Sequence, residues 1–180
     1  MVIGNGESRK NIDLEQFRNS HIFIGCNAIY RDYDVDHIVA CDRFMAYEIQ
    51  KRIKNKNTVI YTREPWDNLQ PLPKGGDLIT WGSGTYAIQL ATELGFRNIV
   101  LIGFDLYSQD NVVNNIYKGT ENYAATEPID PSYWIAHIGQ IIHENPWVSF
   151  SLINSRLWTC PQEWKQSNVN VLTIEQIQVQ

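Results

Sequence analysis

The stretch that decides the fold is WGSGTYAIQLATELGFRNIVLIGFDLY, residues 81–107. Small residues at 82–84 predict a turn that opens a helix. Apolar residues then recur at helical spacing and give this helix one buried face, at Ala87, Leu90, Ala91 and Leu94. Residues 98–102 form a short run rich in β-branched side chains, which predicts a strand buried on both faces. A helix followed by such a strand is typical of an α/β sheet.

The same alternation continues on both sides of this stretch. It predicts helices at 12–17, after Asp42 and after Pro131, a loop at 65–76 and a covering segment at 158–164. Further strands are predicted at 1–3, 21–25, 37–41, 58–62, 148–153 and 169–172. We therefore expect a single Rossmann-like α/β domain over residues 1–180, with a mainly parallel twisted sheet and helices on both faces.

Composition limits the function. The 180 residues carry a formal net charge of −5, with 43% hydrophobic and 19% charged residues, which is typical of a soluble globular domain and argues against a nucleic-acid partner. No apolar run has membrane-spanning length and no signal peptide opens the chain, so we expect a cytoplasmic protein without a membrane span. Cys26, Cys41 and Cys160 lack metal or disulfide spacing, which predicts three reduced thiols and no metal site. The sequence leaves open whether the protein forms a homo-oligomer.

Polar residues follow several predicted strands, where an open α/β sheet binds ligands. The turn Gly4-Asn5-Gly6-Glu7-Ser8 follows the first strand, at the position where doubly wound folds hold phosphates, although it could be a structural turn alone. Asp105 and Tyr107 follow the strand at 98–102. The alternatives are structural: Asp42 and Ser83 can cap helices, and Asp105 can accept backbone hydrogen bonds.

Between residues 108 and 130 the regular pattern stops. This polar stretch is longer than most internal connections, which predicts a lid or binding loop. Asp130 and Pro131 can then start a helix whose buried face is formed by Trp134, Ile135, Ile138, Ile141 and Ile142. His137 falls on the flank of this face and His143 on the opposite, exposed side.

Several of these pieces, in this order, resemble the bacterial sialyltransferases that build lipooligosaccharide. The turn at 4–8 is similar to that family's G-N-G-P-S, and Cys26-Asn27 matches its second-strand Cys-Asn. Residues 83–107 resemble its S-G-x-Y helix start and G-[IF]-D-x-Y strand end without a gap. The segment from Ser132 to His137 resembles the helical segment that ends in the family's catalytic histidine.

The resemblance implies a glycosyltransferase that moves a sugar from a cytidine-activated donor, of the CMP-sialic acid type, to the hydroxyl of a glycan acceptor. Transfer would invert the anomeric carbon and need no metal or other cofactor. His137 would be the base and the hydroxyls of Tyr107 and Tyr117 would stabilise the departing phosphate. The nucleotide-binding residues would be Asn5, Gly6, Ser8, Asn27, Asp42, Ser83, Gly84 and Asp105. We expect Asn5, Ser83, Tyr107 and His137 to surround one pocket.

Three departures keep other functions open. Glu7 replaces the family's proline, Asp42 stands where it has asparagine, and its arginine ahead of the S-G turn is absent, with Thr80 near that position. A wider Rossmann-like group, which includes archaeal-type pterin diphosphokinases, shares the first turn and commonly carries an acidic residue at the position of Asp42. One alternative is therefore a diphosphokinase-like enzyme in which Asp42 and Asp105 hold Mg²⁺ against ATP. The other is a nucleotide- or sugar-binding module without catalysis.

Overall fold

The sheet contains eight strands, and every neighbouring pair is parallel, in a computed structural model that describes residues 1–73, 81–107, 114–123 and 130–177. The strands are β1 (Val2–Ile3), β2 (Ile24–Cys26), β3 (His37–Val39), β4 (Val59–Thr62), β5 (Gln70–Pro71), β6 (Asn98–Ile102), β7 (Ser149–Ile153) and β8 (Val169–Leu172). The α-helices are α1 (Arg43–Arg52), α2 (Ser83–Glu93), α3 (Ser132–Glu144) and α4 (Ile174–Ile177). Four 3₁₀ helices complete the described structure: η1 (Glu7–Arg9), η2 (Leu14–Phe17), η3 (Asn27–Arg31) and η4 (Gln162–Trp164).

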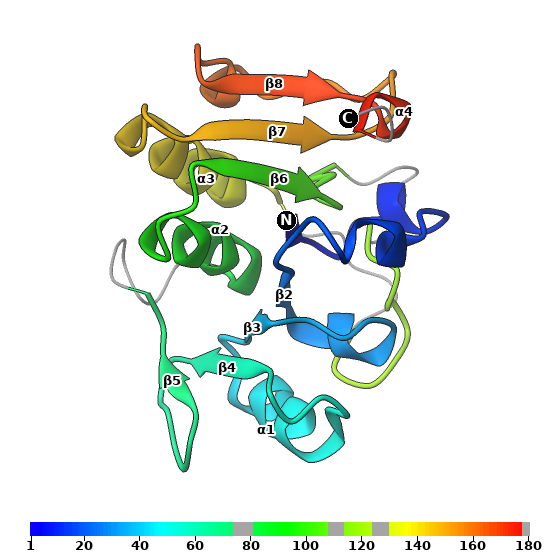
Figure 1. The fold of residues 1–180 in the computed structure, drawn as a ribbon, viewed down its shortest axis with the longest axis vertical. Helices are drawn as coiled ribbons and strands as arrows, with labels where there is room; N and C mark the ends of the chain where they lie inside the picture. The colour runs from blue at the N-terminus through cyan, green and yellow to red at the C-terminus, as the bar shows by residue number, and fades with distance from the viewer. Residues whose placement is uncertain (74–80, 108–113, 124–129, 178–180) are drawn as a thin grey trace.

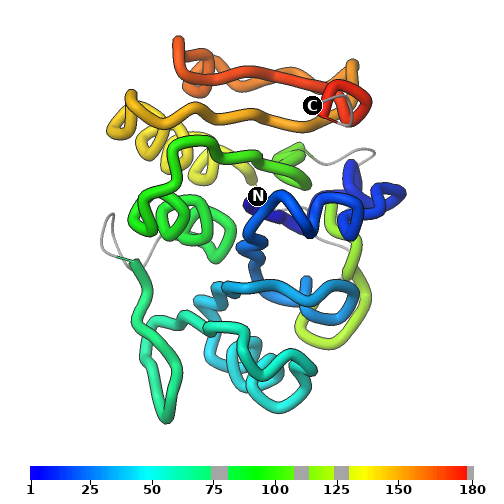
Figure 2. The backbone as a smooth tube through the Cα atoms, viewed as in Figure 1, coloured from blue at the N-terminus to red at the C-terminus, as the bar shows by residue number. Residues whose placement is uncertain are grey.

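The order of the strands reverses at the centre of the sheet. It runs β5-β4-β3-β2-β1-β6-β7-β8, from the bottom to the top of Figure 1. The chain builds one arm outward from β1 and then returns to pair β6 with the other edge of β1, as the tube in Figure 2 traces. In open α/β sheets such a reversal leaves a crevice beyond the carboxyl ends of the two central strands, where ligands bind.

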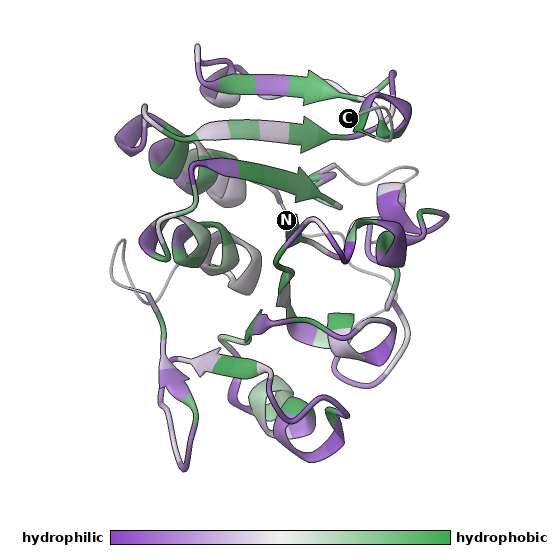
Figure 3. Ribbon diagram, viewed as in Figure 1, coloured by the Kyte–Doolittle hydropathy of each residue, from purple (hydrophilic) through white to green (hydrophobic). Residues whose placement is uncertain are grey.

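Helices cover both faces of the sheet, as the sequence predicts. On one face α2, α3 and η4 pack on the strands around three large buried aromatic side chains, Trp81, Tyr86 and Trp164. On the other face α1 and α4 share the cover with the single-turn helices η2 and η3. The central strands are buried between these layers, and β6 is hydrophobic along almost its whole length (Figure 3).

Two glycines let the carboxyl ends of β1 and β6 meet. Gly103 has a φ of +74°, and a Cβ built on it would lie 2.6 Å from the carbonyl oxygen of Gly4. A side chain at this position would both strain the backbone and push the two chain segments apart. The close approach is fixed by a hydrogen bond of 2.8 Å from the Gly4 amide to the carbonyl of Ile102.

The structure corrects some boundaries. The predicted loop at 65–76 contains β5, whose two residues, Gln70 and Pro71, carry no strand pattern. The predicted helix at 12–17 is a 3₁₀ helix. Trp134 and Ile135 are half-buried, because the core side of α3 is centred one turn later in the chain. Residues 74–80, 108–113 and 124–129 lie outside the described residues, and with them Thr80 and most of the predicted lid. Among the described helices, none combines the length and hydrophobicity needed to cross a bilayer.

Candidate functional site

A cavity of about 650 Å³ lies at the carboxyl ends of the central strands. Its walls come from the turn after β1, the ends of β2, β3 and β4, the start of α2, the turn after β6, the described segment 114–123 and α3. Of the eight residues predicted to bind a nucleotide, all except Ser8 line it: Asn5, Gly6, Asn27, Asp42, Ser83, Gly84 and Asp105. The site therefore forms at the crevice where the strand order reverses.

The β1 turn is held to the end of β6 by the carboxylate of Asp105. This carboxylate accepts hydrogen bonds from the Ser8 amide (2.8 Å) and the Ser8 hydroxyl, and a longer one from Asn154 (3.4 Å). Gly6 makes room for it, because a Cβ on Gly6 would lie 2.5–2.7 Å from the carboxyl atoms. Asp105 thus has the structural role left open by the sequence, although it also lines the cavity.

The amide of Asn5 fixes a second strand end. Its Nδ2 donates to the carbonyl of Cys26 (3.1 Å) and its Oδ1 accepts from Arg9 (3.3 Å). Asn27 begins η3 with a φ of +53°, a left-handed conformation that asparagine tolerates better than most residues. Leu106 lines the same cavity with a φ of +67°. Unusual backbone angles of this kind concentrate at ligand sites, where the surrounding structure enforces them.

Helix α2 points its N-terminus into the cavity. Its N-cap residue is Gly82, no side chain of the described residues caps it, and the first amide groups of an α-helix have no partner within the helix. Thr85, 1% exposed, lines the cavity, and its buried hydroxyl has no hydrogen-bond partner among the described residues. The Ser83 hydroxyl accepts a hydrogen bond of 2.9 Å from the Cys41 amide, which ties α2 to β3. Unpaired donors at a helix N-terminus are well suited to bind an anion.

Asp42 caps α1, which is the structural role that the sequence offers as an alternative to ligand binding. One carboxylate oxygen accepts from the amides of Phe44 (2.8 Å) and Met45 (3.2 Å). Asp42 also lines the cavity, as does Phe44, which is 77% exposed. Asp42 therefore has a demonstrated structural contact, while any contact with a ligand stays a prediction.

Arg63 is a residue that the sequence interpretation missed. It follows β4 directly, lines the cavity and donates a hydrogen bond of 2.9 Å to the carbonyl of Trp81, immediately ahead of the α2 turn. Arg63 is the single positively charged side chain among the described residues that line the cavity. An arginine therefore does reach the region ahead of the α2 turn, where the sequence motif itself lacks one, but it comes from the end of β4. Its position just after an apolar run was the signal available in the sequence.

His137 is not among the residues that line the cavity, but it packs against side chains that do. Trp81 and Tyr133 line the cavity, and their ring centroids lie 5.5 Å and 6.2 Å from that of the imidazole. Its Nδ1 is buried and has no hydrogen-bond partner among the described residues. The expected position of His137 over the pocket is not observed, because the helix turns that flank of α3 toward Trp81.

The two predicted tyrosines also lie away from this cavity. Tyr117 is 6% exposed, and its hydroxyl donates to Asp32 (2.6 Å) and accepts from Arg9 (3.1 Å). Burial, first of all, raises the pKa of this phenol above its usual range, and the bond to Asp32 adds to the shift. Tyr107 is 40% exposed and lines a second cavity together with Ser8. The structure thus does not place Asn5, Ser83, Tyr107 and His137 around one pocket.

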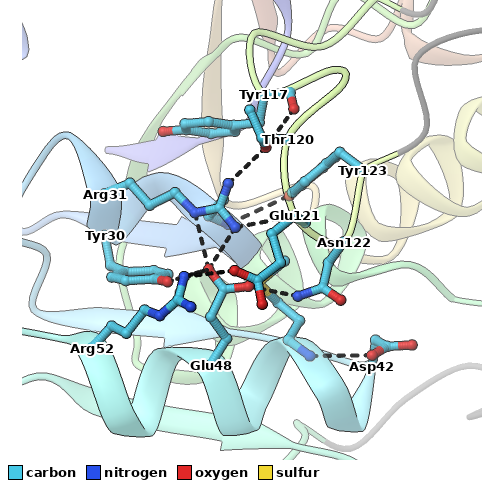
Figure 4. Close-up of polar contacts among 12 residues, drawn as sticks. Tyr30, Arg31, Asp42, Glu48, Arg52, Tyr117, Thr120, Glu121, Asn122 and Tyr123 are labelled. Atoms are coloured by element: carbon cyan, nitrogen blue, oxygen red, sulfur yellow. Dashed lines mark hydrogen bonds and ion pairs between the residues drawn. The ribbon is translucent and has the colours of Figure 1, made fainter.

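The described segment 114–123 forms one wall of the first cavity and is anchored by Glu48 of α1. Figure 4 shows the carboxylate of Glu48 accepting hydrogen bonds from Tyr30, Arg31 and Asn122. Arg31 reaches further, to the hydroxyl of Thr120 (2.7 Å). Since Asn122 lines the cavity, this cluster fixes the wall from behind.

Two further properties of the site are the protonation of its thiols and its ability to hold a metal ion. All three cysteines are free thiols, as predicted. Burial raises the pKa of the Cys26 thiol to about 12 and also raises that of Cys41, so the two thiols that line the cavity stay protonated at neutral pH. Within the described residues, no three His, Cys, Asp or Glu side chains lie close enough to hold a metal ion.

Comparison of the chain with protein-family models, curated proteins and solved structures gives no match. The assignment of a function therefore depends on the cavity itself and on the sequence motifs that surround it.

Proposed function

We propose that this chain is a nucleotide-sugar-dependent glycosyltransferase, which binds a cytidine-activated sugar in the first cavity. The observation that carries the proposal is the convergence of Asn5, Asn27, Ser83 and Gly84 on one cavity at the reversal of strand order. Three separate stretches of the chain contribute these residues, and the sequence motifs of all three predict a ligand site. A volume of about 650 Å³ is in the range of small-molecule sites.

The anionic part of the donor has a natural place. Residues at the N-terminus of α2, including Thr85, line the same cavity as Arg63. Helix amides and a guanidinium together favour a phosphate or carboxylate over a neutral group. Phe44 lines the same cavity and is exposed, so its ring offers a surface on which a base can stack.

Transfer requires one bond to form and one to break. The acceptor oxygen would form a bond to the anomeric carbon, and the bond from that carbon to the phosphate oxygen would break, its electron pair leaving with the phosphate. The phosphate charge would be stabilised by the α2 amides and Arg63. The acceptor proton needs a base. We assign this role to Asp42, which lines the cavity, whereas His137 is not among the residues that line it.

The second candidate function is a nucleotide-binding module without turnover. One observation favours it: His137, Tyr107 and Tyr117, the three side chains predicted to be catalytic, do not line the cavity. This candidate predicts the same ligand and the same contacts but no product. Magnesium-dependent chemistry with ATP is the remaining alternative from the sequence.

Thermal unfolding in the presence of CMP, CDP, UDP, ADP and ATP, each with Mg²⁺ and with EDTA, separates these functions. Ligand at one hundred times its Kd adds ~2.7 kcal/mol, which for a chain of this size raises Tm by roughly 5–10 °C. We expect the largest rise with CMP, unchanged by EDTA. Asn27→Gly should reduce it, because glycine accepts the φ of +53° while the amide is lost. His143→Ala, on the exposed side of α3, is the matched control.

Release of CMP from CMP-sialic acid in EDTA, with and without acceptor sugars, then tests the chemistry. Asp42→Asn keeps the helix cap and removes the basic carboxylate, so it should bind CMP and lose turnover. Loss of turnover in His137→Gln with an active Asp42→Asn would reassign the base. CMP binding without product under any condition supports the binding module. A Tm rise with ATP and Mg²⁺ alone refutes the proposal. The absence of a Tm rise with every nucleotide tested refutes it as well.

A further inference from the structure

A second cavity, of about 460 Å³, adjoins the first. It lies between the β1 turn, the turn after β6 and the segment after β7, and it shares Asp105 and Asn114 with the first cavity. Ser8 and Tyr107, two of the predicted site residues that do not line the first cavity, both line this one. Two hollows that share two wall residues can bring the groups they bind next to each other.

The second cavity combines aromatic faces with neutral hydrogen-bonding groups. Tyr107 lines this cavity and is 40% exposed, and Trp158 is fixed by a hydrogen bond of 2.8 Å from its Nε1 to the carbonyl of Asp105. Side-chain amides and hydroxyls complete the walls, from Asn114, Asn154, Ser155 and Thr159. Aromatic rings pack against the C–H faces of a sugar, while amides and hydroxyls bond the hydroxyls at its edge.

The charges around this cavity are already paired. Lys118 forms an ion pair with Glu7, and the carboxylate of Asp105 accepts hydrogen bonds from Ser8 and Asn154. Lys118 is the one cation among the described residues that line it. The second cavity therefore lacks the free positive charge and the open helix end of the first, and its chemistry selects a neutral polyhydroxyl molecule over a phosphate or carboxylate.

We infer that the second cavity binds a neutral sugar, the acceptor of the reaction proposed above. This inference rests on the proposed function for the role of acceptor, but not for the binding of the sugar. The ring of Tyr107 serves as the platform, and the shared wall at Asp105 and Asn114 lets an acceptor hydroxyl face the donor in the first cavity. Tyr107 thus positions the acceptor rather than the leaving phosphate.

The test is saturation-transfer NMR of the full chain with lactose, maltose and cellobiose as probes, with and without CMP. We expect saturable binding of at least one sugar, weakened about tenfold by Tyr107→Ala and largely kept by Tyr107→Phe, which retains the ring. Tyr47→Ala is the matched control, since Tyr47 is 50% exposed on α1 and lines neither cavity. The Tm rise with CMP should be the same in all three variants.

Absence of saturable binding for all three sugars, or equal binding by the wild type and Tyr107→Ala, overturns the inference. If CMP still raises Tm in that case, the proposed nucleotide site stands without this acceptor site. If a sugar binds through Tyr107 while no nucleotide binds, the proposed function fails and the second cavity remains a sugar site.

Discussion

Replacing Glu48 by glutamine should destabilise the protein and loosen the wall of the first cavity. Glu48 keeps only 4% of its side chain exposed, and its carboxylate accepts hydrogen bonds from Tyr30, Arg31 and Asn122. Glutamine has the same shape but no charge, and its NH₂ group cannot accept from any of these donors. The buried end of Arg31 would therefore lose its counter-charge.

The magnitude follows from the burial of the pair. Removing one partner of a buried ion pair costs about 3–5 kcal/mol, because the other charge is left uncompensated. The Arg31 side chain retains 20% exposure, so water compensates part of the loss. We expect the free energy of unfolding to fall by roughly 2–3 kcal/mol.

Urea denaturation followed by circular dichroism measures this loss, and Glu121→Gln is the matched control. Glu121 belongs to the same cluster and pairs with Arg52 at 2.8 Å, but their side chains are 59% and 56% exposed. Exposed pairs contribute about 0–1 kcal/mol, so the control should stay close to the wild type. Equal stability of the two variants would refute the reasoning.

The pH dependence provides a second check. Burial raises the pKa of Glu48, but hydrogen bonds from Tyr30, Arg31 and Asn122 outweigh it, and the net pKa lies below the usual value. A carboxyl group with a lowered pKa stabilises the fold above its unfolded pKa of about 4.3, and the contribution disappears as the pH falls further. The difference between the wild type and Glu48→Gln should thus be constant at neutral pH and shrink below about pH 4.

Three further predictions concern the scaffold. Trp164→Ala should lower the free energy of unfolding by ~3–5 kcal/mol in urea, since Trp164 is fully buried and donates to the Ile135 carbonyl, whereas Trp147→Ala, at a residue 61% exposed, should change it little. Burial lowers the pKa of His37, so the unfolded state binds the proton more readily and stability should fall as the pH drops below about 6.5; His37→Gln should remove this part of the pH dependence of Tm. Asp42→Ala should cost about 1 kcal/mol in thermal unfolding because the α1 cap is lost, and Asp42→Asn close to nothing.

The sequence is sufficient to predict strands that carry a strong apolar pattern. Residues 98–102 and 169–172 are strands with the predicted bounds, and the parallel sheet follows from the alternation of elements. The short strand at 70–71 carries no such pattern and pairs with β4 only because the turn brings it there. Local pattern thus predicts strands that carry apolar, β-branched residues, including the half-exposed β8, and misses those that tertiary contacts impose.

The same distinction holds for the candidate site. Asn27 and Ser83 lie at the cavity because they follow or precede regular elements, and the topology alone brings those ends together. The position of His137 depends on which aromatic ring covers that flank of α3, and the partners of Tyr117 are distant in the chain, so neither could be predicted from spacing. Arg63 was predictable, since it directly follows a strand.

The place of β1 in the sheet has a consequence for how the protein is made. Val2 pairs with Ile24 on one side and with Leu101 on the other. During synthesis the ribosome therefore releases the whole first arm before β6, the second partner of β1, has been made. Until then one edge of the apolar strand β1 is unpaired. Slow translation ahead of residue 98 would lengthen this exposure and favour aggregation, and a chaperone that shields nascent strands would act there.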